Sequence, residues 1–151
     1  MKLTAFGGLS LATAVSVYIL IVLGGVVSST GSGLACPDWP LCQGQVIPAL
    51  TPSVVIELTH RVWTIVVTIL VVSTMLFAWG KYRWPSRTTG FSTLTFILLL
   101  GQIILGMITV NSRTLPIAVT AHLAVATLVF ASALTTTITV LSHSPGDVRS
   151  N

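Results

Sequence analysis

Four long apolar segments, separated by short polar stretches, dominate the chain. They extend over about residues 5–27, 53–79, 91–110 and 117–141. Each is long enough for a helix that crosses the hydrocarbon of a membrane, which takes roughly 20 apolar residues. The first segment is too long for the apolar part of a secretory signal, so we expect a retained helix. The pattern predicts an all-α integral membrane protein: one domain over residues 1–151, built as a bundle of four transmembrane helices.

The composition agrees with that prediction. Hydrophobic residues make up 53% of the chain and charged residues 7%, with a mean hydropathy of +0.96. Soluble domains are about one quarter charged, so a water-soluble fold is excluded. The net charge of +4 does not indicate a nucleic-acid partner, because the cations flank the apolar segments, as topology determinants do. These cations are Lys2, Lys81, Arg83, Arg87 and Arg149.

The distribution of cations also predicts the orientation. The connection 81–87 carries three of them, whereas the two connections on the other side hold only Arg113. The positive-inside rule therefore places both termini and the basic connection in the cytoplasm, and the segment 28–52 outside. His143 then falls in a solvated cytoplasmic tail. We expect a multi-pass protein of the cell (plasma) membrane, with the lipid bilayer as its surroundings.

The outer segment 28–52 is rich in Gly, Pro and Ser and holds both cysteines, so we expect it to form a lid over the bundle. Cys36 and Cys42 lie on the side where disulfides persist, and a disulfide is favoured over a metal site. Two prolines already restrict the short ring, so the bond would add modest stability. A structural staple and a redox-active or heme-handling pair both remain open.

Three ionisable residues lie near the outer end of the second helix. Glu57, His60 and Arg61 are three and four positions apart, which places them on one face. Ionisable groups within a span are costly and normally face the bundle interior, so they indicate a functional site. The alternative is a Glu57–Arg61 ion pair at the interface, with Arg61 directed outward and His60 packed beside it.

His122 strengthens the functional interpretation. It follows Pro116 at the start of the fourth helix much as His60 follows Pro52, and both helices run from the outside inward. Two imidazoles at similar depth suit the axial ligation of a heme iron, near the extracytoplasmic side. Zinc ranks second, because it usually needs further protein ligands, and no metal ranks third. Arg113 could pair with a heme propionate or be a solvated loop cation.

Several motifs, in order along most of the chain, resemble the heme A synthases of the CtaA family. They are Gly24-Gly25 leading into Ser29-Thr-Gly-Ser-Gly-Leu34, Cys36-Pro-Asp-Trp-Pro-Leu-Cys42, Glu57-x-x-His60-Arg61, Gln102-Ile-Ile-Leu-Gly106 and Thr120-Ala-His-Leu123. The cysteine loop together with the Glu-x-x-His-Arg motif is specific, so a chance match is excluded.

The resemblance implies a heme-modifying oxidoreductase. Its substrate is heme O, whose ring methyl is oxidised to a formyl group to give heme A for terminal oxidases. Glu57 and His60 are then catalytic, and His60 and His122 are axial ligands of heme iron. Apart from the resemblance, we expect Arg61 and Arg113 to bind the cofactor. The cysteines of the outer loop form a disulfide. A carboxylate cannot accept the electrons, which leave through an iron cofactor, heme b, or an electron-transfer partner.

The chain departs from the family in length, because larger members join two such halves, one for the substrate and one for heme b. A homo-oligomer, dimer or trimer, would restore two sites, since identical chains usually form closed assemblies. One site could instead serve both hemes in turn. A heme O synthase is a further candidate partner. Two other functions stay open: a b-type cytochrome or heme carrier, and a four-span scaffold protein.

Overall fold

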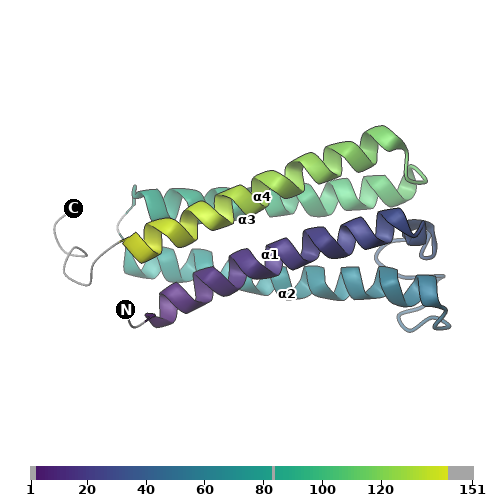
Figure 1. Cartoon of the computed structure of the whole chain (residues 1–151), viewed down its shortest axis with the longest axis horizontal. Helices are drawn as coiled ribbons and strands as arrows, with labels where there is room; N and C mark the ends of the chain where they lie inside the picture. Colours follow the sequence, from purple (N-terminus) through teal and green to yellow (C-terminus); the bar gives the residue numbers. More distant parts are fainter. Residues whose placement is uncertain (1–2, 83, 143–151) are drawn as a thin grey trace.

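A computed structural model describes residues 3–82 and 84–142, and four long α-helices make up most of it (Figure 1). They are α1 (Ala5–Ser29), α2 (Pro52–Lys81), α3 (Arg87–Asn111) and α4 (Pro116–Ser142), with a short 3-10 helix, η1 (Ser32–Leu34), after α1. All four are long and apolar enough to cross a membrane, and the described residues contain no strand. The predicted fold class is confirmed. The predictions for Lys2, Arg83, His143 and Arg149 concern residues outside the described ranges.

Local caps set the ends of the helices. Thr51 caps α2 by accepting a hydrogen bond from the Val54 backbone N–H, and Pro52 occupies the first turn, where no intrahelical donor is needed. Ser86 and Thr89 form a reciprocal capping box at the start of α3. For this reason α3 begins at Arg87, before the apolar segment that predicted a start near residue 91.

Each helix packs against two others around the bundle. α1 lies against α2 and α4, and α3 lies against α4 and α2, so α2 and α4 occupy opposite corners. The start of α1, the end of α4 and the connection between α2 and α3 lie at one end, here called the terminal end (Figure 1). The loop after α1 and the connection between α3 and α4 lie at the other, here called the disulfide end.

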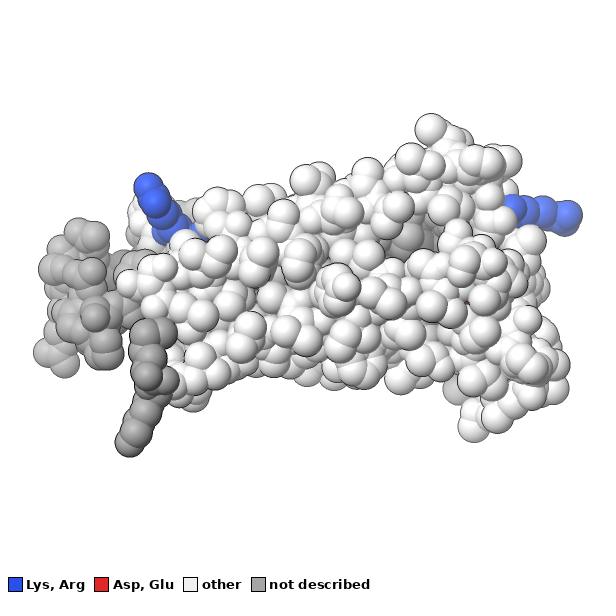
Figure 2. Space-filling view, in the orientation of Figure 1, with Lys and Arg blue, Asp and Glu red and all other residues white. Residues whose placement is uncertain are grey.

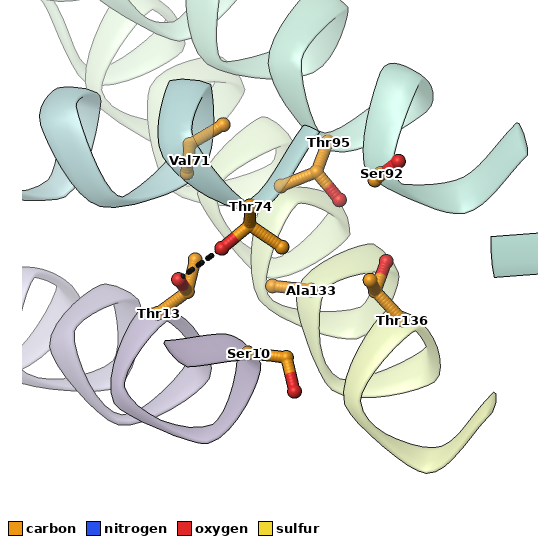
Figure 3. A pocket seen from close by; sticks show the side chains of 8 residues that line it. All are labelled: Ser10, Thr13, Val71, Thr74, Ser92, Thr95, Ala133 and Thr136. Carbon is orange, nitrogen blue, oxygen red and sulfur yellow. Dashed lines mark hydrogen bonds between the residues drawn. The ribbon is translucent and has the colours of Figure 1, made fainter. Parts of the chain in front are cut away.

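Hydroxyl side chains line a small cavity in the half of the bundle near the terminal end (Figure 3). The cavity has a volume of about 10 Å³, and all four helices contribute to its lining. Thr13 and Thr74 are joined across α1 and α2 by a hydrogen bond of 2.7 Å. Thr95 of α3 donates to Ser132 of α4 at 2.9 Å. Such pairs hold helices together where lipid gives no hydrophobic driving force.

An apolar layer fills the middle of the bundle. Its buried members come from all four helices: Ala14, Val17, Val67, Val71, Leu99, Val129 and Ala133. The outer faces are also apolar, for example Ile65 and Ile69, each 61% exposed. The Lys and Arg side chains visible in Figure 2 lie at the two ends. Such a surface suits lipid around the middle of the bundle, as expected for a multi-pass membrane protein.

Candidate functional site

The two cysteines of the loop after α1 form a disulfide, as predicted. Both are buried, at 0% exposure for Cys36 and 2% for Cys42, and they pack with Val54 and Leu58 of α2. The loop is therefore docked on the first turns of α2, where the ionisable residues begin.

Asp38 folds the ring that the disulfide closes. Its carboxylate accepts hydrogen bonds from the backbone N–H groups of Gln43, at 2.6 Å, and Gly44, at 2.8 Å. The Gly44 hydrogen bond is the largest cause that holds the pKa of Asp38 below its ordinary value, and the bond from Gln43 adds to it. Gly44 has a positive φ of 72°, which a residue without Cβ adopts without strain.

Arg61 connects this loop to α2. Its Nε donates to Glu57 Oε1 at 2.8 Å, so the predicted proximity of Glu57 and Arg61 is confirmed. Its terminal nitrogens donate to the carbonyl oxygens of Asp38 (3.0 Å), Leu41 (2.8 Å) and Cys36 (3.0 Å). Four of the five guanidinium N–H groups are thus used within the protein. The acceptors in the loop are backbone atoms, which leave no signal in the sequence.

His60 lies against the backbone of α1 at Gly24. A Cβ added at Gly24 would stand 3.2 Å from His60 Cε1, which is closer than side chains normally allow. His60 Nδ1 is fully buried and has no hydrogen-bond partner among the described residues. The glycine therefore provides the space that the ring occupies.

His122 repeats this arrangement on the other pair of helices. A Cβ added at Gly106 of α3 would stand 3.2 Å from His122 Cε1, and His122 Nδ1 is also buried without a partner in the described part of the chain. The second ring nitrogen, Nε2, lies 3.1 Å from the amide nitrogen of Gln102. Gln102 is only 9% exposed, and its Oε1 has no partner within the described ranges.

The two histidines lie in the same half of the bundle, near the disulfide end, on helices that face each other across it. Buried imidazole nitrogens without partners are unfavourable unless something else binds them. Two such rings, each in a space that a Cβ would fill, fit the axial ligands of a flat metal-centred group.

A metal held by protein side chains alone fits less well. Among residues 3–82 and 84–142, no three His, Cys, Asp or Glu side chains converge as a metal site would require. A zinc site usually has at least three such ligands, so the described residues do not support zinc as the second candidate.

Arg113 is exposed in the connection between α3 and α4, at the disulfide end. The neighbouring Thr114 approaches the loop after α1, because a Cβ added at Gly33 would stand 3.3 Å from Thr114 Cγ2. The backbone of Arg113 is hydrogen-bonded to Val110 and Thr114, and its side chain makes no hydrogen bond within the described part of the protein. Propionate binding by Arg113 stays a prediction, as does cofactor binding by Arg61.

Sequence reasoning did not assign a role to Gln102, although it lies in one of the motifs that carried the resemblance. A glutamine within an apolar segment is itself a signal, because an amide in a membrane span needs a partner. Gly24 and Gly106 leave room for the two rings, a role that the sequence alone does not distinguish from close helix packing.

Comparison with known proteins gives one consistent result. The family model described as cytochrome oxidase assembly protein (COX15-CtaA) matches residues 8–55 and 49–151. The chain is 33% identical over 143 residues to a heme A synthase of Bacillus pumilus, with 93% of this chain and 47% of the relative covered. It is 30% identical over 137 residues to a heme A synthase of Bacillus licheniformis, with 90% and 45% covered.

The chain therefore spans about half the length of the curated relatives it matches. No solved structure matches it. The family model covers most of the chain, including the cysteine loop, both histidines and Gln102. On that evidence the chain belongs to the COX15-CtaA family of cytochrome oxidase assembly proteins.

Proposed function

We propose that this chain is a heme A synthase unit, which binds heme O between His60 and His122 and oxidises a ring methyl group to a formyl group. The observation that supports it best is the pair of buried imidazoles, each with an unpaired Nδ1 and each packed against a glycine of the neighbouring helix. The relatives named heme A synthase, of Bacillus species, point to the same chemistry.

The residues around the histidines have separable roles in this proposal. His60 and His122 hold the iron and fix the porphyrin in the bundle. Glu57 is 4% exposed and lies one turn before His60, so it would take up or pass on protons released at the methyl carbon. Arg61 holds Glu57 Oε1 in place and ties it to the loop, and Arg113 would bind a propionate at the disulfide end.

Converting the methyl to a formyl group adds one oxygen atom, which water would supply, and releases protons and electrons. The electrons need an acceptor that no side chain of this site supplies. A second heme, heme b, would pass them to an electron-transfer partner. We place heme b in a second copy, within a dimer or trimer, since identical chains usually form closed assemblies. A heme O synthase would deliver the substrate.

The orientation follows from chemistry at the two ends. A buried disulfide persists on the extracytoplasmic side, whereas Lys81 and Arg87 at the terminal end suit the cytoplasmic face. We therefore place the disulfide end, with the heme site, outside the cytoplasm, and the protein in the plasma membrane.

The test is to purify the protein in detergent from cells that make heme O, extract its pigment and identify it by mass. We expect heme A in wild type, a weakened Soret band in His60→Ala and His122→Ala, and bound heme without heme A in Glu57→Ala. Glu57→Gln is the matched control, because its amide oxygen can still accept from Arg61. Heme B alone, with no heme A in any variant, would identify a b-type cytochrome or heme carrier instead.

A further inference from the structure

A groove on the outer surface of α3, near the terminal end, has no part in the proposed function. It has a volume of about 190 Å³ and is lined by Arg87, Gly90, Phe91 and Leu94. These residues are three, one and three positions apart, so they form a stripe along one side of the helix. Gly90 opens the middle of the stripe, because a Cβ added there would meet nothing within 4 Å. The groove therefore combines a cation at one end with an apolar floor.

The cation at the end of the groove can bind an anion. Arg87 is exposed, and its side chain has no hydrogen-bond or ion-pair partner among residues 3–82 and 84–142. The two acidic residues in that part of the chain, Asp38 and Glu57, both lie near the disulfide end. Arg87 is also the first residue of α3, where the helix adds a partial positive charge. The described residues at this end thus offer a positive charge that nothing among them neutralises.

The groove covers the depth of a lipid headgroup and the first part of an acyl chain. Leu94 lies seven positions after Arg87, and a helix rises about 1.5 Å per residue, so the groove extends roughly 10 Å along α3. The exposed rings of Trp79 and Trp84 lie 6.2 Å apart at the same end, and Trp79 Nε1 donates to Thr93 Oγ1 of α3 at 3.0 Å. Indole rings settle at headgroup level, so Arg87 lies near the headgroups and Leu94 near the acyl chains.

We propose that this groove binds an anionic phospholipid, with its phosphate on Arg87 and an acyl chain along Gly90, Phe91 and Leu94. A guanidinium pairs with a phosphate through two parallel N–H donors, and the apolar floor accommodates a chain that a free phosphate ion lacks. Basic sites beside membrane spans on the cytoplasmic side select such headgroups, and the proposed orientation puts this end there. The histidines lie in the other half of the bundle, so the inference goes beyond the heme chemistry and does not depend on it.

The test is a competition between two lipids for the purified full chain in detergent. The protein is incubated with equal amounts of phosphatidylglycerol and phosphatidylcholine that carry the same acyl chains, and free lipid is removed by gel filtration. The retained lipids are extracted and quantified by mass. We expect wild type to retain phosphatidylglycerol preferentially. The retained ratio should fall about fivefold in Arg87→Gln, the factor that corresponds to roughly 1 kcal/mol for one cation at a membrane surface.

Gly90→Leu tests the apolar part of the groove separately. Leucine keeps the charge of Arg87 and favours the helix, but it fills the groove, so the preference for phosphatidylglycerol should again be lost. Helical circular dichroism checks that both variants are folded. A wild-type preference that survives in Gly90→Leu would show that the groove does not hold the lipid, and the inference would be wrong.

Two matched controls change the same end of the bundle outside the groove. Lys81→Gln removes a cation whose Nζ lies 5.7 Å from the centroid of the Phe6 ring, and Gly80→Leu adds the same side chain at a glycine of α2 where a Cβ also meets nothing within 4 Å. Both should retain lipid as wild type does. If Lys81→Gln loses as much as Arg87→Gln, or Gly80→Leu as much as Gly90→Leu, the preference does not come from the groove and the inference is overturned.

Inorganic phosphate distinguishes a lipid from a free anion. Added during the incubation at constant ionic strength, it should leave the retained ratio unchanged, because it cannot occupy the apolar floor. Loss of the bound phosphatidylglycerol to inorganic phosphate, or equal retention of the two lipids by wild type, would refute the lipid site. None of these outcomes bears on heme binding, so the proposed function is tested independently by its own pigment analysis.

Discussion

Replacing Arg61 with Met should detach the disulfide loop from α2. The substitution keeps an apolar stem of similar length but removes the ion pair with Glu57 and the three hydrogen bonds to loop carbonyls. The side chains of Arg61 and Glu57 are only 15% and 5% exposed, so solvent screens their interaction little. Breaking such a pair leaves an uncompensated buried carboxylate.

The expected loss in the free energy of unfolding is about 3–5 kcal/mol, the usual result of removing one member of a buried pair. The loop carbonyls add less than the roughly 1.5–3 kcal/mol typical of hydrogen bonds to charged groups, because they regain water when the loop moves. Glu57→Gln should lose only about 1–2 kcal/mol, since its amide oxygen can still accept from Arg61 Nε.

Unfolding is measured by titration with SDS in mixed micelles, followed by helical circular dichroism. A second measurement is the rate at which a small thiol reduces the disulfide, because attack needs access to sulfur and both cysteines are buried. Reduction should be faster in Arg61→Met than in Glu57→Gln. If Arg61→Met loses less than about 1 kcal/mol and its disulfide is reduced no faster than in wild type, Arg61 does not hold the loop.

Three further predictions concern other parts of the bundle. Gly106→Ala should displace the His122 ring and weaken heme retention by about 1–3 kcal/mol, seen as faster heme loss, whereas Gly101→Ala, whose Cβ meets nothing within 4 Å, should not. Asp38 has a lowered pKa, so its contribution to loop stability is present above the ordinary value of 3.8 and is lost as pH falls through the lower folded value. The protection of the two backbone amides that donate to Asp38, measured as their hydrogen exchange relative to the intrinsic rate at each pH, should therefore fall in acid, and Asp38→Asn should flatten that dependence. Thr74→Val should lower the free energy of unfolding by about 0.6 kcal/mol, and by no more than about 1.7, in the same SDS titration.

The four helices could be predicted because each apolar segment is as long as a membrane is thick. Their ends could be predicted less well, because the caps lie outside the apolar segments. Ser86 illustrates this: its capping box with Thr89 starts α3 before the apolar residues begin. The N-cap signal was readable in the sequence, whereas apolar length alone pointed to a later start.

The candidate site, like the helices, could be predicted only in part. The spacing of Glu57, His60 and Arg61 predicted a shared face, and the structure shows the expected Glu57–Arg61 contact. The partners that hold the site could not be predicted, because Arg61 binds backbone carbonyls and His60 packs against a missing side chain at Gly24. Every residue has a carbonyl oxygen and every glycine lacks a Cβ, so the sequence does not show which of them make these contacts.

The arrangement of the four helices explains why neither hairpin could form this site alone. His60 and His122 come from α2 and α4, at opposite corners of the bundle, while α1 and α3 supply the glycines that admit the rings. The apolar middle layer separates the rings from the hydroxyl-lined cavity near the terminal end. Substitutions of the hydroxyl residues in that cavity should therefore alter the stability of the bundle without altering heme ligation. Substitutions of the two glycines or of Gln102 should alter heme ligation without altering stability. The two halves of one bundle thus carry separable tasks, cohesion at one end and ligand binding at the other.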